Sequence, residues 1–111
     1  MRKRFFYGAL FVIAVALFNT FGITKVVGRS MEPTYYNKDH LLYCKHMQPQ
    51  PGDVIIVRDP LDSRDVLIKR VMWISSDEVY VLGDNRDNSE DSRTFGSLPT
   101  TSILGVVLFS R

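Results

Sequence analysis

The chain opens with a long apolar run. Residues 5–23 carry no charge, and Asn19 and Thr20 are their only clearly polar members. As an α-helix this run would extend about 28 Å, close to the roughly 30 Å hydrocarbon thickness of a membrane. The basic residues 2–4 precede it, so the positive-inside rule places the N-terminus in the cytoplasm. The pattern predicts a single transmembrane helix.

A cleaved secretory signal has the same ingredients, a basic start and an apolar run. This run is longer than a usual signal core, and Phe18, Phe21 and Ile23 occupy the region where a small-residue cleavage site would be needed. We therefore favour a retained anchor. It divides the chain into a cytoplasmic basic tip with the anchor, residues 1–24, and an extracytoplasmic domain, residues 25–111.

The apolar residues after the anchor occur in short runs separated by proline, glycine and polar turns. No segment there shows a helical period of 3.6 residues, and several alternate as strands do. Strands are predicted at residues 23–27, 41–44, 54–58, 66–75, 78–82 and 103–109. The expected fold is mainly β, a small antiparallel sheet or partly open barrel preceded by one N-terminal helix.

Charge and cysteine usage exclude several classes of function. Three of the fourteen Lys and Arg residues precede the anchor, which leaves eleven against twelve Asp and Glu, so the domain is almost neutral. A nucleic-acid binder would show a basic face. Cys44 is the single cysteine, and its spacing with His40 and His46 falls in a polar connection, where a metal site is not favoured. We predict no nucleic-acid partner, no metal and no cofactor.

Two residues carry candidate chemistry. Ser30 lies in residues 28–34, between a glycine and Pro33, which hold the backbone extended or turning. On local sequence alone, a serine in a polar stretch is usually just a loop residue. Lys69 lies inside an apolar strand, where alternation places it on one face with aliphatic residues and Trp73.

A strand lysine has two interpretations, which the strand alone leaves open. The side chain can run along the sheet surface to water. Alternatively, desolvation lowers the pKa of its amine and makes it a general base near neutral pH. Together with an exposed serine, such a lysine forms a candidate Ser-Lys dyad for acyl transfer.

Four motifs extend this pair to a family resemblance. They are Gly-x-Ser-Met-x-Pro-Thr at 28–34, Pro-Gly-Asp-Val at 51–54, Ile-Lys-Arg-Val at 68–71, and Gly-Asp-Asn-Arg-Asp-Asn-Ser-Glu-Asp-Ser-Arg-x-Phe-Gly at 83–96. In this order and after an apolar segment, they resemble the type I signal peptidases. Thirteen residues separate Lys69 from Gly83, where many bacterial members insert a further β-rich subdomain. The chain resembles the compact members of the family.

The resemblance implies a role for each matching residue. Ser30 is the nucleophile, and its backbone N–H is one oxyanion donor. Lys69 is the general base, and Ser89 orients it by a hydrogen bond. Two ion pairs brace the site, namely Arg70 with Asp84, and Asp91 with Arg93. Some members add a serine hydroxyl two residues before the nucleophile as a second oxyanion donor, but this chain has Gly28 there.

The implied function is a membrane-bound serine endopeptidase that cleaves N-terminal signal peptides from exported precursor proteins through an acyl-enzyme. The family prefers small residues one and three positions before the cleaved bond, and Met31 and residues 41–44 are candidates for the pocket that selects them. The implied partners are precursor proteins and the lipid bilayer. The predicted location is the plasma membrane, with the active site on its outer face, and the mitochondrial inner membrane ranks second.

Three other functions compete with this one. The chain could be a dedicated maturation protease for one exported or organellar substrate. It could be a catalytically silent subunit of a processing complex, although both candidate catalytic residues are present. A self-cleaving repressor-type regulator is disfavoured, because the chain contains no Ala-Gly pair before the serine.

Overall fold

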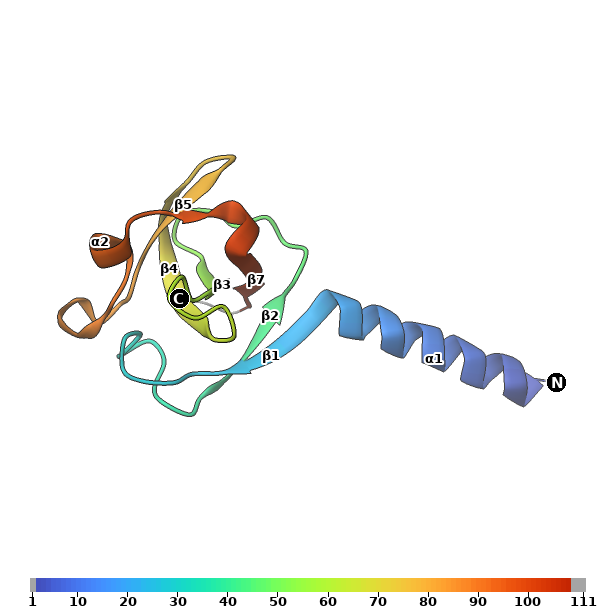
Figure 1. The fold of residues 1–111 in the computed structure, drawn as a ribbon. Coiled ribbons are helices and arrows are strands. Elements are labelled where there is room, and N and C mark those ends of the chain that lie inside the picture. Colours follow the sequence, from blue (N-terminus) through green and yellow to red (C-terminus); the bar gives the residue numbers. More distant parts are fainter. Residues whose placement is uncertain (1, 109–111) are drawn as a thin grey trace.

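The N-terminal helix projects from the rest of the molecule as a separate rod. A computed structural model describes residues 2–108, with side chains from Phe6 onward. Helix α1 (Arg2–Thr20) extends away from the β domain, and the two meet where α1 continues into strand β1 (Phe21–Lys25) (Figure 1). The apolar run therefore divides at Thr20, and its last three residues belong to a strand.

Residues after strand β2 (His40–Cys44) fix the end of α1. The backbone N–H of Lys45 donates to the carbonyl of Thr20 at 2.8 Å, and its Nζ donates to the carbonyl of Phe18 at 2.9 Å. A ring nitrogen of His46 lies 2.9 Å from the carbonyl oxygen of Asn19. Carbonyls at a helix end have no partner within the helix, so these contacts satisfy them from outside.

The sequence predicted a transmembrane helix, and the structure does not support it. Among the residues that the structure describes, no helix has both the length and the apolar character needed to cross a membrane.

The rest of the chain forms one antiparallel sheet, which confirms the prediction of a mainly β fold. The strands lie in the order β1-β2-β7-β3-β4-β5-β6. Beyond β1 and β2 they are β3 (Val54–Arg58), β4 (Val66–Ile74), β5 (Glu78–Leu82), β6 (Leu98–Pro99) and β7 (Ile103–Val107). The C-terminal strand β7 pairs with both β2 and β3. It therefore joins the N-terminal hairpin to the strand that pairs with β4.

Both faces of the central strands are buried. Residues Val54, Ile55, Ile56 and Val57 of β3 are each at most 1% exposed. Their side chains alternate between two apolar clusters. One cluster contains Val26, Met31, Leu41, Val54, Ile56, Ile68 and Val107; the other contains Ile55, Val57, Val71, Val79, Val81, Leu98 and Val106. Because β4 contributes to both clusters, a polar side chain at its centre is enclosed.

A bulge in β4 changes one expected neighbour of Lys69. Val71 pairs with Val81, but Trp73 pairs with Tyr80, so one residue of β4 is extra at this point. A bulge of this kind interrupts the alternation of faces. Trp73 is 44% exposed and stacks on Tyr80, with ring centroids 5.6 Å apart. The prediction that Trp73 shares the face of Lys69 is therefore wrong.

The predicted strands agree with the observed ones to within two residues at each end that the structure describes. Residue 109, the predicted end of the last strand, lies outside the described residues. The sequence analysis missed four short elements: the helix α2 (Ser92–Phe95), the 3₁₀ turns η1 (Arg86–Asn88) and η2 (Thr100–Ser102), and β6. Each has four residues or fewer, which is too short for hydrophobic periodicity to reveal.

Candidate active site

One cavity of about 330 Å³ brings the two candidate catalytic residues together. Ser30 comes from the turn after β1, and Lys69 comes from the middle of β4. Lys25 and Val27, Asp59 and Asp65, and the β4 residues Val66, Leu67 and Ile68 also line this cavity. Residues that are 39 positions apart in the sequence therefore face the same space.

Ser30 lies on a tightly bonded turn. The N–H groups of Thr34 and Tyr35 donate to the carbonyl of Met31 at 2.8 and 3.0 Å. The Met31 side chain is 1% exposed and belongs to the first apolar cluster, so it ties the turn to the core. Ser30 itself is half-buried. Ser30 thus lines the cavity on a backbone that packing holds in place.

Lys69 is enclosed, with 3% of its surface exposed. Burial lowers the pKa of its amine, because the charged form loses its hydration, whereas the nearby carboxylates of Asp91 and Glu90 oppose this shift. The Nζ atom donates a hydrogen bond to Ser89 Oγ at 3.2 Å. This environment favours the neutral amine that a general base requires.

Asp91 holds Ser89 in position. Its carboxylate is fully buried and accepts hydrogen bonds from Ser89 Oγ, from the Gly83 N–H and from Arg93 Nε, each at 2.9 Å. Burial alone would raise the pKa of this carboxyl, but these hydrogen bonds outweigh it and hold the pKa well below its usual range. Asp91 is therefore an anion at neutral pH, and the single proton of the Ser89 hydroxyl points to it.

A second ion pair connects β4 to the turn of Ser30. Arg70 donates to Asp84 through Nε at 2.9 Å and through Nη2 at 2.8 Å, and both side chains are mostly buried. The hydroxyl of Thr34 also donates to Asp84. Burial would raise the pKa of Asp84, but the hydrogen bonds from Arg70 and Thr34 lower it overall. One carboxylate thus joins the strand of Lys69 to the turn of Ser30.

Gly83 lies where three parts of the site meet. A Cβ atom at this position would lie 2.6 Å from Ser89 Cβ and 2.7 Å from the Ser30 carbonyl oxygen. Contacts that short do not occur, so any side chain here would displace Ser89 or the turn of Ser30. Glycine is required by space at this position.

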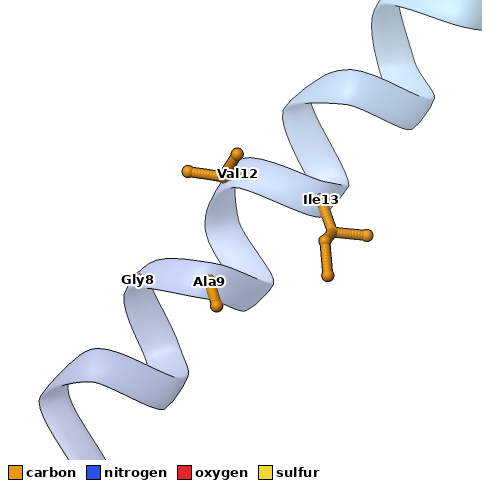
Figure 2. A pocket seen from close by; sticks show the side chains of 4 residues that line it. All are labelled: Gly8, Ala9, Val12 and Ile13. Carbon is orange, nitrogen blue, oxygen red and sulfur yellow. The ribbon is translucent and has the colours of Figure 1, made fainter.

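A larger hollow lies far from this chemistry. It has a volume of about 570 Å³ and runs along α1, where Gly8, Ala9, Val12 and Ile13 line it (Figure 2). None of these four side chains can ionise or act as a nucleophile. This hollow therefore offers no catalytic chemistry.

Comparison with known proteins identifies the family. A model of the family described as signal peptidase, peptidase S26, matches residues 2–79 and 72–110. The chain belongs to the signal peptidase family. Family membership supports a protease, and the resemblance drawn from the four motifs is thereby confirmed.

The relatives of this chain include mitochondrial inner membrane protease subunits and bacterial enzymes named signal peptidase I. The human mitochondrial inner membrane protease subunit 1 is 29% identical over 79% of this chain and 68% of its own length. The corresponding protein of Xenopus tropicalis is 32% identical over 70% of this chain and 61% of its own length. Signal peptidase I of Helicobacter pylori is 33% identical over 64% of this chain, but the match covers only 25% of that enzyme.

These relatives contradict the predicted location. The sequence analysis placed the chain in the plasma membrane, with its active site on the outer face. Relatives from animals, a plant and a yeast are instead named for the mitochondrial inner membrane. The plasma-membrane prediction depended on the basic residues before an apolar run, and this charge pattern does not distinguish one bilayer from another.

The structure connects the supporting residues through Lys69–Ser89–Asp91–Arg93 and Arg70–Asp84, and it adds two residues to the site. Thr34 contacts Asp84, and Asn85 contacts the turn of Ser30 through its backbone and its side chain. Both residues lie inside the quoted motifs, at 28–34 and 83–96. Their presence in those motifs was the available signal, but sequence spacing could not show which partners they reach. The suggested pocket residues, Met31 and 41–44, do not line the Ser30 cavity.

Proposed function

We propose that this chain is a serine endopeptidase of the mitochondrial inner membrane that removes N-terminal targeting segments from precursor proteins with a Ser30-Lys69 dyad. The observation that carries the proposal is one cavity lined by a half-buried serine and a lysine with 3% exposure. Buried lysines without a carboxylate in direct contact are rare, because burial disfavours the ammonium. In this site the amine contacts a hydroxyl, Ser89 Oγ.

The first half of the reaction forms an acyl-enzyme. The neutral Lys69 amine accepts the proton of the Ser30 hydroxyl, and Ser30 Oγ attacks the carbonyl carbon of the substrate. The backbone N–H of Ser30 stabilises the negative charge that develops on the carbonyl oxygen. When the intermediate collapses, the Lys69 ammonium gives its proton to the leaving amine, and the C–N bond breaks.

The second half regenerates the enzyme. Lys69, neutral again, takes a proton from a water molecule, which attacks the ester carbonyl. The new tetrahedral intermediate collapses, the Ser30 oxygen leaves, and the Lys69 ammonium returns the proton to it. The Lys69–Ser89–Asp91 chain of hydrogen bonds holds the amine in place through both halves.

The names of the relatives support the proposed location. Several are subunits of a mitochondrial inner membrane protease, so we propose organellar precursor proteins and the inner-membrane bilayer as partners. This chain spans about two thirds of the length of the human relative.

The dyad is tested by replacing each member. In Ser30→Ala and Lys69→Ala, we expect precursor cleavage to fall more than about a thousandfold in kcat/KM, because the residues of such a dyad act as one unit. Ser63→Ala, an exposed serine in the turn before β4, is the matched control and should cleave as the wild type does. Full activity in either dyad variant would refute the proposed mechanism.

A labelling experiment separates an enzyme from a silent subunit. A serine-acylating inhibitor should modify Ser30 of the wild-type chain and should not react with the folded Lys69→Ala variant, because the hydroxyl then lacks its base. Mass spectrometry of the labelled peptide gives the site. An unlabelled wild-type chain would favour the non-catalytic subunit.

A further inference from the structure

Asn85 bonds twice to the turn that carries the nucleophile. Its backbone N–H donates to the Ser30 carbonyl at 2.8 Å, and its side-chain Nδ2 donates to the Arg29 carbonyl at 3.0 Å. Asn85 follows β5, 56 positions from Arg29 in the sequence. It therefore holds two successive carbonyl groups of the Ser30 turn from outside that turn.

The second of these bonds constrains the direction of the Ser30 N–H, together with the bond that the Glu32 N–H donates to the same carbonyl. The Arg29 carbonyl and the Ser30 N–H belong to one peptide unit, which is planar, with the two groups pointing in opposite directions in its trans form. A donor that holds the carbonyl on the Asn85 side therefore turns the N–H away from Asn85. Within the part of the chain that the structure describes, this N–H has no hydrogen-bond acceptor.

Gly28, two residues before Ser30, provides no side-chain donor that could stabilise the oxyanion together with this N–H. Glycine has no hydroxyl to offer, and the Gly28 N–H already donates to Asn37 Oδ1 at 2.9 Å. Gly28 has a φ of 90°, where an L-residue is strained. The stabilisation of an oxyanion at Ser30 then depends on how accurately the Ser30 N–H is aimed.

We propose that Asn85 is a positioning residue for the oxyanion site, and that its side-chain amide aims the Ser30 N–H by holding the Arg29 carbonyl. The inference rests on the proposed dyad function. Asn85 does not touch the substrate in this scheme and does not line the cavity. It acts through the Arg29–Ser30 peptide unit.

The alternative is that Asn85 merely stabilises the turn. Two other hydrogen bonds should preserve the turn when the Asn85 side chain is removed. The Glu32 N–H also donates to the Arg29 carbonyl, at 3.2 Å, and the backbone bond from Asn85 to Ser30 is independent of the side chain. A change at the Asn85 side chain should therefore alter the aim of one peptide unit and leave the turn in place.

The test compares Asn85→Ala and Asn85→Asp with Asp87→Ala in the full chain. Asp87 is exposed in the same loop, which makes it the control. The substrate is a peptide with small residues one and three positions before the cleaved bond, and the ground-state probe is the same peptide with that amide reduced to a methylene-amine. Removal of an oxyanion donor costs on the order of 10² to 10³ in kcat, so misdirecting one should lower kcat about ten- to a hundredfold.

The expected kinetic pattern distinguishes a role of Asn85 in orienting the Ser30 N–H from a role in stabilising the turn. In Asn85→Ala, kcat falls while KM and the Kd of the reduced peptide stay within about twofold of wild type, because only the transition state carries the oxyanion. In Asn85→Asp, kcat falls further, because the carboxylate cannot donate to the Arg29 carbonyl and its negative charge repels that oxygen. The pH at which kcat/KM reaches half its maximum stays unchanged, since Lys69 is not touched.

Three results would overturn the inference. A wild-type kcat in Asn85→Ala, in a chain that Ser30→Ala inactivates, would refute the role of Asn85 and leave the dyad standing. A matching loss in KM or in peptide binding would show a structural role instead. A wild-type chain that cleaves no such peptide and does not react at Ser30 would refute both the dyad and this inference.

Discussion

We expect Lys69 to make the folded chain less stable than an apolar residue would at the same position. Its amine is buried, and burial lowers its pKa below the ordinary lysine value of about 10.4. Between the folded pKa and that value, the unfolded chain binds more protons than the folded chain. The free energy of unfolding therefore rises with pH through this window, and the stability is lost as the pH falls through the folded pKa.

We therefore predict that Lys69→Met is inactive but more stable than the wild type at neutral pH. The advantage in the free energy of unfolding should shrink as the pH rises toward the ordinary lysine pKa, because the wild-type amine is then neutral in both states. Urea unfolding of both proteins at a series of pH values measures this difference in the free energy of unfolding. A stability difference that does not change with pH would contradict the prediction.

The protonation of the Lys69 amine should also control the pH dependence of activity. A general base works in its neutral form, so kcat/KM of the wild type should increase with pH up to the pKa of Lys69 and then level off. Because the pKa is lowered, this plateau begins below the pH expected for an exposed lysine. The pH profile of peptide cleavage gives the midpoint directly.

At the scale of elements, Asp84 joins strand β4 to the turn of Ser30 through Arg70 and Thr34. In Arg70→Ala, this mostly buried carboxylate loses its ion partner, and we predict a loss of about 3 kcal/mol in the free energy of unfolding. Arg64→Ala is the control, because it removes an ion pair with Asp62 in an exposed turn, where no measurable change is expected. Equal effects of the two substitutions would contradict this account.

Strands and short turns differ in how well the sequence predicts them. The 54–58 and 78–82 runs gave the observed strands β3 and β5, because each has an apolar pattern bounded by turn residues. The end of α1 at Thr20 was not predicted, because Lys45 and His46 fix it from a distant segment. The bulge that moves Trp73 depends on the pairing with β5, which spacing along β4 does not encode.

The candidate site shows the same limit. Motif matching placed Ser30, Lys69, Ser89 and both ion pairs, since these residues lie at fixed positions in the quoted motifs. Asn85 lies in the same motifs, but its role depends on a contact to Arg29 across 56 positions. Such contacts follow from the three-dimensional arrangement and have no local pattern.

At the scale of the whole molecule, the chain is elongated, with extents of 60 × 31 × 26 Å, because α1 projects from the β domain (Figure 1). Lys45 and His46 hold the carbonyls at the end of that helix. The cationic side chain of Lys45 also interacts favourably with the negative end of the helix dipole. The direction of the rod relative to the Ser30 cavity is thus fixed by a few polar contacts.

We predict that the double variant Lys45→Ala, His46→Ala frays the last turn of α1 and leaves the dyad intact. Amide hydrogen exchange of residues 16–20 should accelerate, whereas kcat on a short peptide should not change. His40→Ala, an exposed histidine on β2, is the control. Unchanged exchange in the double variant would show that the backbone bond from Lys45 to Thr20 suffices.

Trp73, which stacks on Tyr80, provides an intrinsic fluorescence probe of this chain. Trp73 is the single tryptophan of the sequence, so the intrinsic fluorescence excited at the indole band comes from one place. That place is the bulge where β4 pairs with β5, on the strand that carries Lys69 and beside the strand that leads to Gly83. A change in emission therefore follows the separation of the two strands that hold the base and its orienting loop, without any added dye.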